Sequence, residues 1–203
     1  MDADAVEIRV LGCMIEKQRT TPDVYPLTLN ALRAACNQTT NREPVVSYDE
    51  PTIRAALHRL AQRGWARLAS GPGSRAVKYR HLLGDALDVD ERELAVLCVL
   101  MLRGGQTPGE LKARTERMQA FDSLAELHET LDGLTARELV ARLQRQPGQK
   151  EERYVQLLRG EDGAPAAEPA PPAAGDIEAR LSRLEADVAA LRRAVESLSP
   201  APD

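Results

Sequence analysis

The sequence predicts a mainly α-helical protein with small β-hairpins, built as two tandem winged helix-turn-helix domains followed by a C-terminal coiled-coil helix. Three observations predict it: an internal repeat, a Pro-Gly turn between two strand-like segments in each copy, and a heptad pattern near the end of the chain. We expect domains over residues 1–83 and 84–160, a Pro- and Ala-rich linker over 161–175, and the coil over 176–199.

The repeat rests on short identities that keep their order along the chain. Glu7, Leu11 and Thr21-Pro22 are matched 86 positions later by Glu93, Leu97 and Thr107-Pro108. Ala66-Arg67-Leu68 is matched 75 positions later by Ala141-Arg142-Leu143. Because the second spacing is shorter, the first copy holds eleven extra residues in its middle, close to residues 37–44.

Three helices are expected in the first copy. The first is amphipathic, with one face formed by Ile8, Leu11 and Ile15. A second is expected around residues 27–35 and a third over residues 49–63. Gly64 is placed to end the third helix in a left-handed cap.

The second copy repeats this pattern, beginning with a helix over residues 91–102. A capping box, Thr107-Pro108-Gly109-Glu110, predicts the start of the next helix. The third helix is expected over residues 123–137, starting at a capping box formed by Ser123 and Glu126.

Each set of helices is followed by a predicted β-hairpin. Residues 65–69 and 76–80 flank Gly71-Pro72-Gly73, and residues 139–143 and 153–157 flank Pro147-Gly148. Three helices followed by a two-stranded hairpin is the order of a winged helix-turn-helix domain. An all-helical bundle is the competing interpretation, but it leaves both Pro-Gly turns unexplained.

Composition excludes several classes of protein. Aromatic residues make up 3% of the chain, which is too few for a single-strand binder that stacks bases on exposed rings. The longest apolar run, Leu94–Leu102, is shorter than the roughly 20 residues of a membrane-spanning helix. No signal peptide and no disulfide framework are expected, so the pattern indicates a reduced cytoplasmic protein with no membrane association.

No group of residues points to catalysis. Cys13, Cys36 and Cys98 are typical of buried free thiols, and His58, His81 and His128 lack metal-ligand spacing with them. The sequence contains no phosphate-binding loop, dinucleotide fingerprint or locally supported Ser-His-Asp arrangement. We therefore expect no enzymatic activity, no cofactor and no metal.

Charge points to a nucleic-acid partner for the first copy. The net charge is -4, yet residues 1–83 alone carry an excess of basic residues. The predicted interface is a basic face on the third helix, a wing and one loop residue: Arg54, His58, Arg59 and Arg63, then Arg75, Lys78 and Arg80, then Arg42. A third helix of this kind commonly enters the major groove. This favours a duplex DNA-binding regulator or nucleoid-associated protein over a solvated basic helix.

The second copy favours a different function. Its third helix carries Glu126, Glu129 and Asp132, and Glu138 follows it. Phosphate would repel these carboxylates. The alternative function is therefore a protein–protein interaction adaptor or assembly factor without nucleic-acid binding, which contacts a partner through residues 84–160.

The extra segment of the first copy, residues 37–44, is polar. Such a segment is either a functional loop or one capped internally by its own Asn and Thr side chains. Internal capping is slightly favoured. Arg42 is the candidate here for a phosphate or partner contact.

The last part of the chain shows a strict heptad pattern. Its apolar positions are Ile177, Leu181, Leu184, Val188, Leu191, Val195 and Leu198. Mostly Val at the a positions with Leu at d favours a parallel two-stranded coil, and hence a homodimer. The alternative is one amphipathic helix that folds back onto the winged helices.

Three segments of the chain have an unusual and specific sequence. They read TTPDVYPLTLN from Thr20, ACNQTTNREPV from Ala35 and LRGGQTPGEL from Leu102. With these segments, residues 5–160 resemble the bacterial YceH family, and the tail is similar to the coiled segment of that family. The resemblance implies a tandem winged-helix fold and brings no activity and no catalytic residue to this chain.

Overall fold

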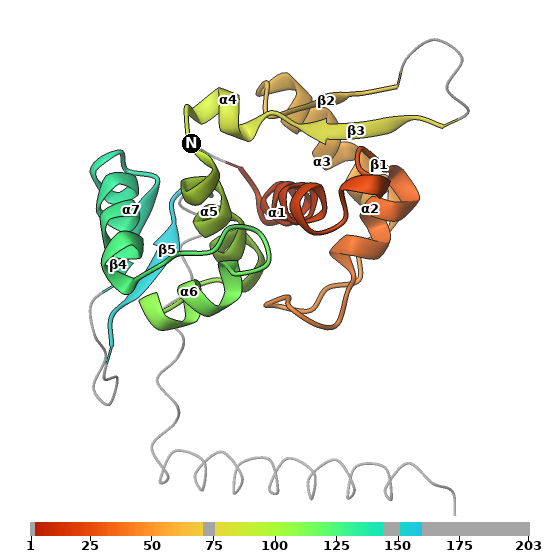
Figure 1. Ribbon diagram of the computed structural model, residues 1–203. Helices are drawn as coiled ribbons and strands as arrows, with labels where there is room; N and C mark the ends of the chain where they lie inside the picture. The colour runs from red at the N-terminus through yellow and green to blue at the C-terminus, as the bar shows by residue number, and fades with distance from the viewer. Residues whose placement is uncertain (1–2, 71–75, 144–150, 160–203) are drawn as a thin grey trace, which may run out of the picture. The chain divides into compact units, whose positions relative to one another are not determined.

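The computed structural model describes residues 3–70, 76–143 and 151–159, and all of them belong to one compact unit (Figure 1). The predicted linker, the predicted coiled coil and Arg75 lie outside these residues.

The first half of the unit contains three α-helices and a small sheet. Its elements are α1 (Ala5–Thr20), η1 (Pro22–Val24), β1 (Leu27–Thr28), α2 (Leu29–Cys36), α3 (Glu50–Gln62), β2 (Ala66–Leu68) and β3 (Lys78–His81). The three strands are antiparallel in the order β1-β3-β2, with Leu27 and Leu68 both opposite Tyr79. The two longer strands, β2 and β3, form the hairpin that the sequence predicts.

The second half repeats the order of helices and hairpin. Its elements are α4 (Leu83–Leu87), α5 (Glu91–Arg103), α6 (Pro108–Thr115), α7 (Leu124–Ala136), β4 (Val140–Leu143) and β5 (Arg153–Gln156). Gln106 pairs with Tyr154 in an isolated bridge, in the place that β1 takes in the first half. The structure thus confirms a mainly helical protein with small antiparallel sheets.

The repeat is clearest where α1 and α5 begin. Asp4 caps α1 through a reciprocal capping box with Glu7, and Asp90 caps α5 through the same arrangement with Glu93. Each pair occupies the positions that the 86-residue spacing predicts. In both halves a local pattern of four residues fixes the first turn of the helix, because it satisfies backbone N–H groups that have no partner within the helix.

Thr21-Pro22 and Thr107-Pro108 match in sequence but begin different kinds of element in the two halves. Thr107 caps α6, but Thr21-Pro22 starts the short helix η1. The residue that caps α2 is Thr28, which accepts a hydrogen bond from the backbone of Ala31 at 3.2 Å. The second helix expected around residues 27–35 is thus confirmed as α2, and η1 and β1 precede it.

Two other predicted helix ends can be compared directly. Gly64 follows α3 with φ +74°, which confirms the left-handed cap. Ser123 caps α7 by accepting a hydrogen bond from the backbone of Glu126. The Glu126 carboxylate, however, accepts from the backbone of Asp122 and not of Ser123, so only half of the predicted capping box is present.

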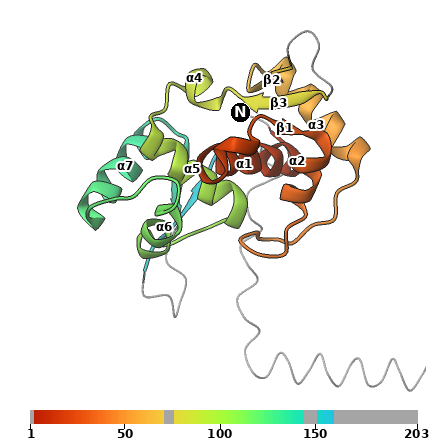
Figure 2. The same ribbon diagram turned by 45° about the vertical axis from the view of Figure 1, so that its right-hand side comes forward.

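The two halves share one hydrophobic core, in which α1 and α5 pack against each other (Figure 2). The prediction of an amphipathic α1 is wrong, because every residue from Glu7 to Ile15 is buried. Helices α2, α3 and α5 all contact α1, so no side of this stretch faces solvent. The expected boundary between residues 83 and 84 falls at the start of α4.

Candidate nucleic-acid interface

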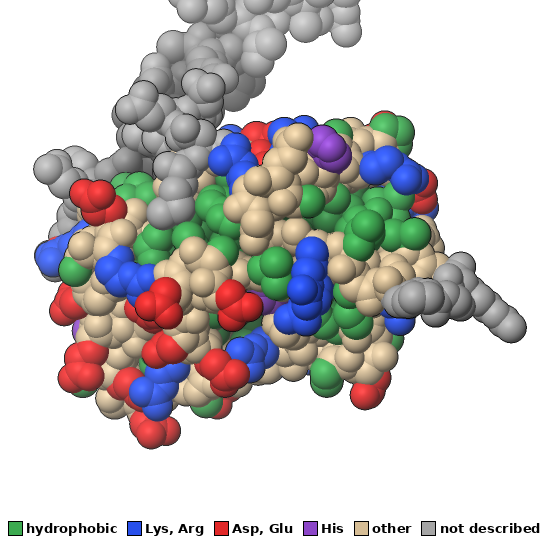
Figure 3. Space-filling model, turned by 90° about the horizontal axis from the view of Figure 1, so that it is seen from above, with side chains coloured by type: hydrophobic (Ala, Val, Ile, Leu, Met, Phe, Trp, Pro, Cys, Tyr) green, Lys and Arg blue, Asp and Glu red, His purple; other side chains and the backbone are tan. Residues whose placement is uncertain are grey.

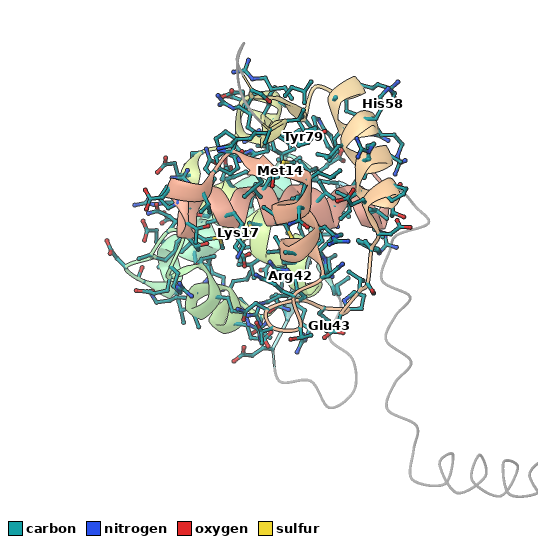
Figure 4. The ribbon with its side chains drawn as sticks, turned by 90° about the vertical axis from the view of Figure 1, so that its right-hand side faces the viewer. Met14, Lys17, Arg42, Glu43, His58 and Tyr79 are labelled. Carbon is teal, nitrogen blue, oxygen red and sulfur yellow. The ribbon has the colours of Figure 1, made fainter. Side chains whose placement is uncertain are left out.

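Helix α3 separates a buried face from an exposed one. Its start is fixed by Asp49, whose carboxylate accepts a hydrogen bond from the backbone of Thr52 at 2.9 Å. The buried face consists of Ile53, Ala56, Leu57 and Leu60. Arg54 and His58 lie on the exposed side, and in Figure 4 His58 is at the outer surface. The side chain of Arg54 is 66% exposed, and its nearest carboxylate, that of Glu50, is 4.0 Å away.

Two other predicted arginines of α3 are held by acidic residues at the start of α1. Arg59 lies 2.5 Å from the Asp4 carboxylate and 3.4 Å from that of Glu7. Arg63 lies 3.2 Å from Glu7, and its guanidinium is 5.7 Å from the ring centre of Trp65. These arginines therefore connect α3 to the capping box of α1.

The second half repeats this connection. Arg137, just after α7, contacts the Glu93 carboxylate at 3.3 Å, and Glu93 belongs to the capping box of α5. Because the same pairing occurs in both copies, it belongs to the repeated fold. Arg59 and Arg63 thus have a structural role that does not require a nucleic acid.

The sheet of the first half has an outward basic face. Arg67 on β2 lies directly opposite Arg80 on β3, and Lys78 is two residues before Arg80 on the same face. None of the three pairs with a carboxylate among the described residues, and the Nε of Arg80 has no hydrogen-bond partner there. Like charges that face each other across two strands destabilise a sheet, so this pair is a candidate for binding an anion.

Sequence reasoning placed Lys78 and Arg80 in the wing but missed Arg67. The signal was present, because Ala66 and Leu68 flank Arg67 and alternation sends it to the opposite face of the strand. Figure 3 views the side of the molecule on which this sheet lies. Basic and hydrophobic side chains mix there, while acidic side chains gather on the left, over the second half.

Arg42 lies inside the protein, on the other side of α1 from His58 and Tyr79 (Figure 4). Its side chain is 0% exposed and binds both oxygens of the Glu16 carboxylate, at 2.6 and 3.0 Å. It also donates to the carbonyl oxygens of Ala35 and Asn41 and to the side chain of Gln38. A phosphate cannot reach a guanidinium in this position, so Arg42 does not fit the contact expected from the sequence.

The loop around Arg42 is capped internally. The side chain of Asn37 donates to the carbonyl oxygen of Tyr48 and accepts from its backbone N–H, both at 2.8 Å. Arg9 donates to the carbonyl oxygen of Pro44 at 2.6 Å, and the backbone of Glu43 donates to Leu102 of α5 at 2.8 Å. The preferred interpretation of residues 37–44 therefore agrees with these contacts.

Helix α7 has the acidic outer side that the sequence predicts. Glu129 and Asp132 are exposed, and Glu126 pairs with Arg92 at 2.5 Å. Glu138 follows the helix with φ 55° and is exposed as well. This side of the second half is poorly suited to phosphate.

The three cysteines are free and buried. Cys98 donates from its thiol to the carbonyl oxygen of Gly12 at 3.3 Å, and burial raises the pKa of this thiol well above its ordinary value. Among the described residues, no group of three or more His, Cys, Asp or Glu side chains is placed to hold a metal ion. No helix in that part of the chain is long and apolar enough to span a bilayer.

His81 is the buried histidine of β3, with 6% of its surface exposed. Burial, together with the charges of Arg80 and Arg19, lowers its pKa to about 4. We expect the folded protein to lose stability as the pH falls below 6.5. In this range His81 is protonated in the unfolded chain but stays neutral in the folded one. The loss is about 2 kcal/mol between pH 7.5 and pH 5.

Urea unfolding at pH 7.5 and pH 5 measures this difference. In His81→Gln the pH-dependent loss should be smaller by that amount, whatever the substitution costs at pH 7.5. His128→Gln, at an exposed histidine of α7, serves as the control and should behave as the wild type does. An equal pH dependence in all three proteins would contradict the expectation.

The fold and the site together define a mainly helical protein made from an internal repeat, with a basic sheet face on its first half that has no carboxylate partner among the described residues. The family model described as "Protein of unknown function, DUF480" matches residues 3–149. The chain therefore belongs to the DUF480 family.

Similar proteins from several bacteria agree with this assignment. A UPF0502 protein of Opitutus terrae is 51% identical over 191 residues, which cover 92% of this chain and 82% of that protein. The UPF0502 protein YceH of Escherichia fergusonii is 45% identical over 204 residues, covering 96% and 94%. The resemblance to the YceH family is thus confirmed.

Proposed function

We propose that this protein binds duplex DNA through its first half, as a regulator or a nucleoid-associated protein. The observation that carries the proposal is the basic sheet face, where Arg67 and Arg80 lie opposite each other without a carboxylate partner in the described chain. In this proposal the first half is a winged helix, with α3 as the recognition helix and the β2–β3 hairpin as the wing.

The proposed contact residues differ in part from those expected from the sequence. Arg54 and His58 on α3 and Arg67, Lys78 and Arg80 on the sheet form the proposed set. Arg54 would contact base edges or phosphate from the major groove, and the sheet residues would contact the backbone. Arg59, Arg63 and Arg42 are left out, because they are engaged by acidic side chains of the protein.

We expect Arg54→Ala combined with Arg67→Ala to weaken duplex binding at least tenfold, because two phosphate-binding charges are lost. Fluorescence anisotropy with a labelled duplex between 50 and 200 mM salt measures this. The log-log slope against salt should also become shallower by roughly 2.

The matched control is Arg92→Ala combined with Arg142→Ala. Arg142 is the counterpart of Arg67 in the repeat, but it pairs with Glu152, and Arg92 pairs with Glu126. The control variant removes two positive charges, as the test variant does, and should bind the duplex as tightly as the wild type does. Absence of duplex binding at 50 mM salt, or an equal loss in both variants, would contradict the proposal.

We also propose that the heptad residues near the C-terminus pair two chains, as their sequence pattern favours. A dimer would place two basic faces on one duplex and raise its affinity through effective concentration. Sedimentation equilibrium of the full chain at micromolar concentration should then give twice the monomer mass. A monomer would favour a tail helix that folds back on its own chain.

The acidic side of α7 supports a second candidate function, that of an adaptor or assembly factor. Glu129 and Asp132 would contact a basic protein partner there. If the protein is an adaptor, the full chain should capture the same protein partner from nuclease-treated and from untreated extract. Its capture should be lost in Glu129→Lys combined with Asp132→Lys, while the wild-type chain fails to bind duplex at low salt.

A further inference from the structure

A polar groove lies between the two halves, on the side of α1 away from the basic sheet face (Figure 4). It consists of two adjoining hollows of about 510 and 280 Å³, which share Glu16, Thr20, Asn41 and Arg117 among their lining residues. One wall is formed by the end of α1 and the loop after α2. The other wall is formed by the ends of α5 and α6. In Figures 1 and 2 the loop after α2 lies beside α6.

The groove has an excess of positive charge. Four basic side chains line it, Lys17, Arg103, Arg114 and Arg117, against one carboxylate, Glu16. Glu16 is already neutralised by the buried Arg42 behind it, at 2.6 Å. Of the four cations, Lys17 also lies 3.5 Å from Glu16, and Arg114 lies 3.3 Å from the carboxylate of Glu110.

Two of these four basic residues have no acidic partner in the described part of the chain. Arg117 is exposed, and Arg103 donates to the amide oxygen of Asn41 instead of a carboxylate. Burial and the nearby charges of Arg114 and Arg42 lower the pKa of Arg103, in that order of importance. The folded protein thus holds guanidinium groups close together, and a bound anion would relieve their repulsion.

The loop adds neutral donors on a fixed backbone. Thr39 and Thr40 line the larger hollow and are exposed, while the loop on either side of them is held by Asn37, Arg42 and Glu43. This order precedes any ligand, so little conformational entropy is lost on binding. This loop spans 13 residues, 37–49, whereas the connection between α6 and α7 in the second half spans 8, residues 116–123.

We propose that this groove binds a small molecule carrying a di- or triphosphate group. Guanidinium groups contact phosphate oxygens in pairs, and several cations along one groove suit more than one phosphate. The volume lies in the range of small-molecule sites, and Val99, Leu102 and Met118 give the smaller hollow an apolar wall for the rest of the ligand.

Isothermal titration calorimetry of the full chain with pyrophosphate, ATP and adenosine tests the proposal. Pyrophosphate or ATP should bind, and Arg117→Ala combined with Lys17→Ala should lower the affinity at least tenfold. Adenosine should bind at least tenfold more weakly than ATP. The proposal is overturned if neither phosphate compound binds at 1 mM, if adenosine binds as tightly as ATP, or if the variant binds as the wild type does.

The duplex interface provides the control, and it separates this proposal from the proposed function. Arg54→Ala combined with Arg67→Ala should leave the binding of pyrophosphate or ATP unchanged, because both residues lie outside the groove. An equal loss of phosphate binding in this variant would assign the anion to the basic sheet face and overturn the groove site. Duplex binding, measured separately, has no bearing on either result.

Discussion

Arg42→Ala is expected to lower the free energy of unfolding by about 3 kcal/mol or more, the range for a buried ion pair that loses one partner. The side chain of Arg42 is 0% exposed, and that of Glu16 is 15% exposed. The substitution therefore leaves a largely buried carboxylate whose remaining cation is Lys17, at 3.5 Å. It also removes the donor that satisfies the carbonyl oxygen of Ala35.

The pH dependence of stability identifies the cause of this loss. Burial by itself would raise the pKa of Glu16, but the hydrogen bond and the charge of Arg42 outweigh burial and lower it. A lowered pKa in the folded state stabilises the protein above the ordinary pKa of a glutamate, and this contribution is lost as the pH falls below it. The wild-type chain should thus be more sensitive to acid in this range than Arg42→Ala.

Urea unfolding followed by circular dichroism measures both effects. Arg54→Ala is the matched control, because Arg54 is exposed and lies 4.0 Å from Glu50; it should change stability by less than about 0.5 kcal/mol. If Arg42→Ala does not fold, Glu16→Gln removes the same charge pair with little change of shape. A loss below about 1 kcal/mol in every variant would show that the ion pair does not hold the loop.

Gly12→Leu is expected to destabilise the protein by about 3 kcal/mol, the upper end of the usual range for overpacking. A Cβ atom at this position would lie 2.9 Å from Leu102 Cγ and 3.1 Å from Met101 Cβ, across the contact of α1 with α5. A longer side chain must therefore push the two helices apart. Gly12→Ala should cost less, since the gain in helix propensity offsets part of the clash.

Differential scanning calorimetry tests whether this contact makes the two halves one cooperative unit. The wild-type chain should unfold in one transition, and Gly12→Leu should lower its midpoint and broaden or split it. Gly109→Ala, in α6, is the control, because a Cβ atom there meets nothing within 4 Å and the variant should be neutral or slightly more stable. Two separate transitions in the wild type would contradict the shared core.

Much of the fold could be predicted from the sequence, because the signals that specify it are local. The ends of α3 and α7 follow from their caps, Asp49 and Ser123, and from Gly64. Both hairpins follow from alternation around a Pro-Gly turn. Where the two copies differ, the repeat is a weaker guide: Thr21-Pro22 matches Thr107-Pro108 in sequence, but it starts a short 3-10 helix and not the next α-helix.

The candidate site was less predictable, because it depends on which partners the fold supplies. Periodicity shows that Arg59 and Arg63 leave the core face of α3, but it does not show that they meet Glu7, which lies 56 residues before Arg63. The same holds for Arg42 and Glu16. Which arginines, such as Arg67, lack a carboxylate partner in the described part of the chain is known only once these pairs are placed.

The sequence by itself determined the repeat, the order of three helices and a hairpin in each half, the excess of positive charge in the first half and the family; η1, β1 and α4 were not expected from it. The tertiary structure decided that α1 is buried on all sides from Glu7 to Ile15, and which arginines pair with a carboxylate of the described chain. The physical reason is range: caps, turns and alternation act over a few residues, whereas a charge is neutralised by whatever lies beside it in space. Arg54 and Arg59 are both predicted on the exposed face of the same helix, yet of these two only Arg59 contacts the capping box of α1.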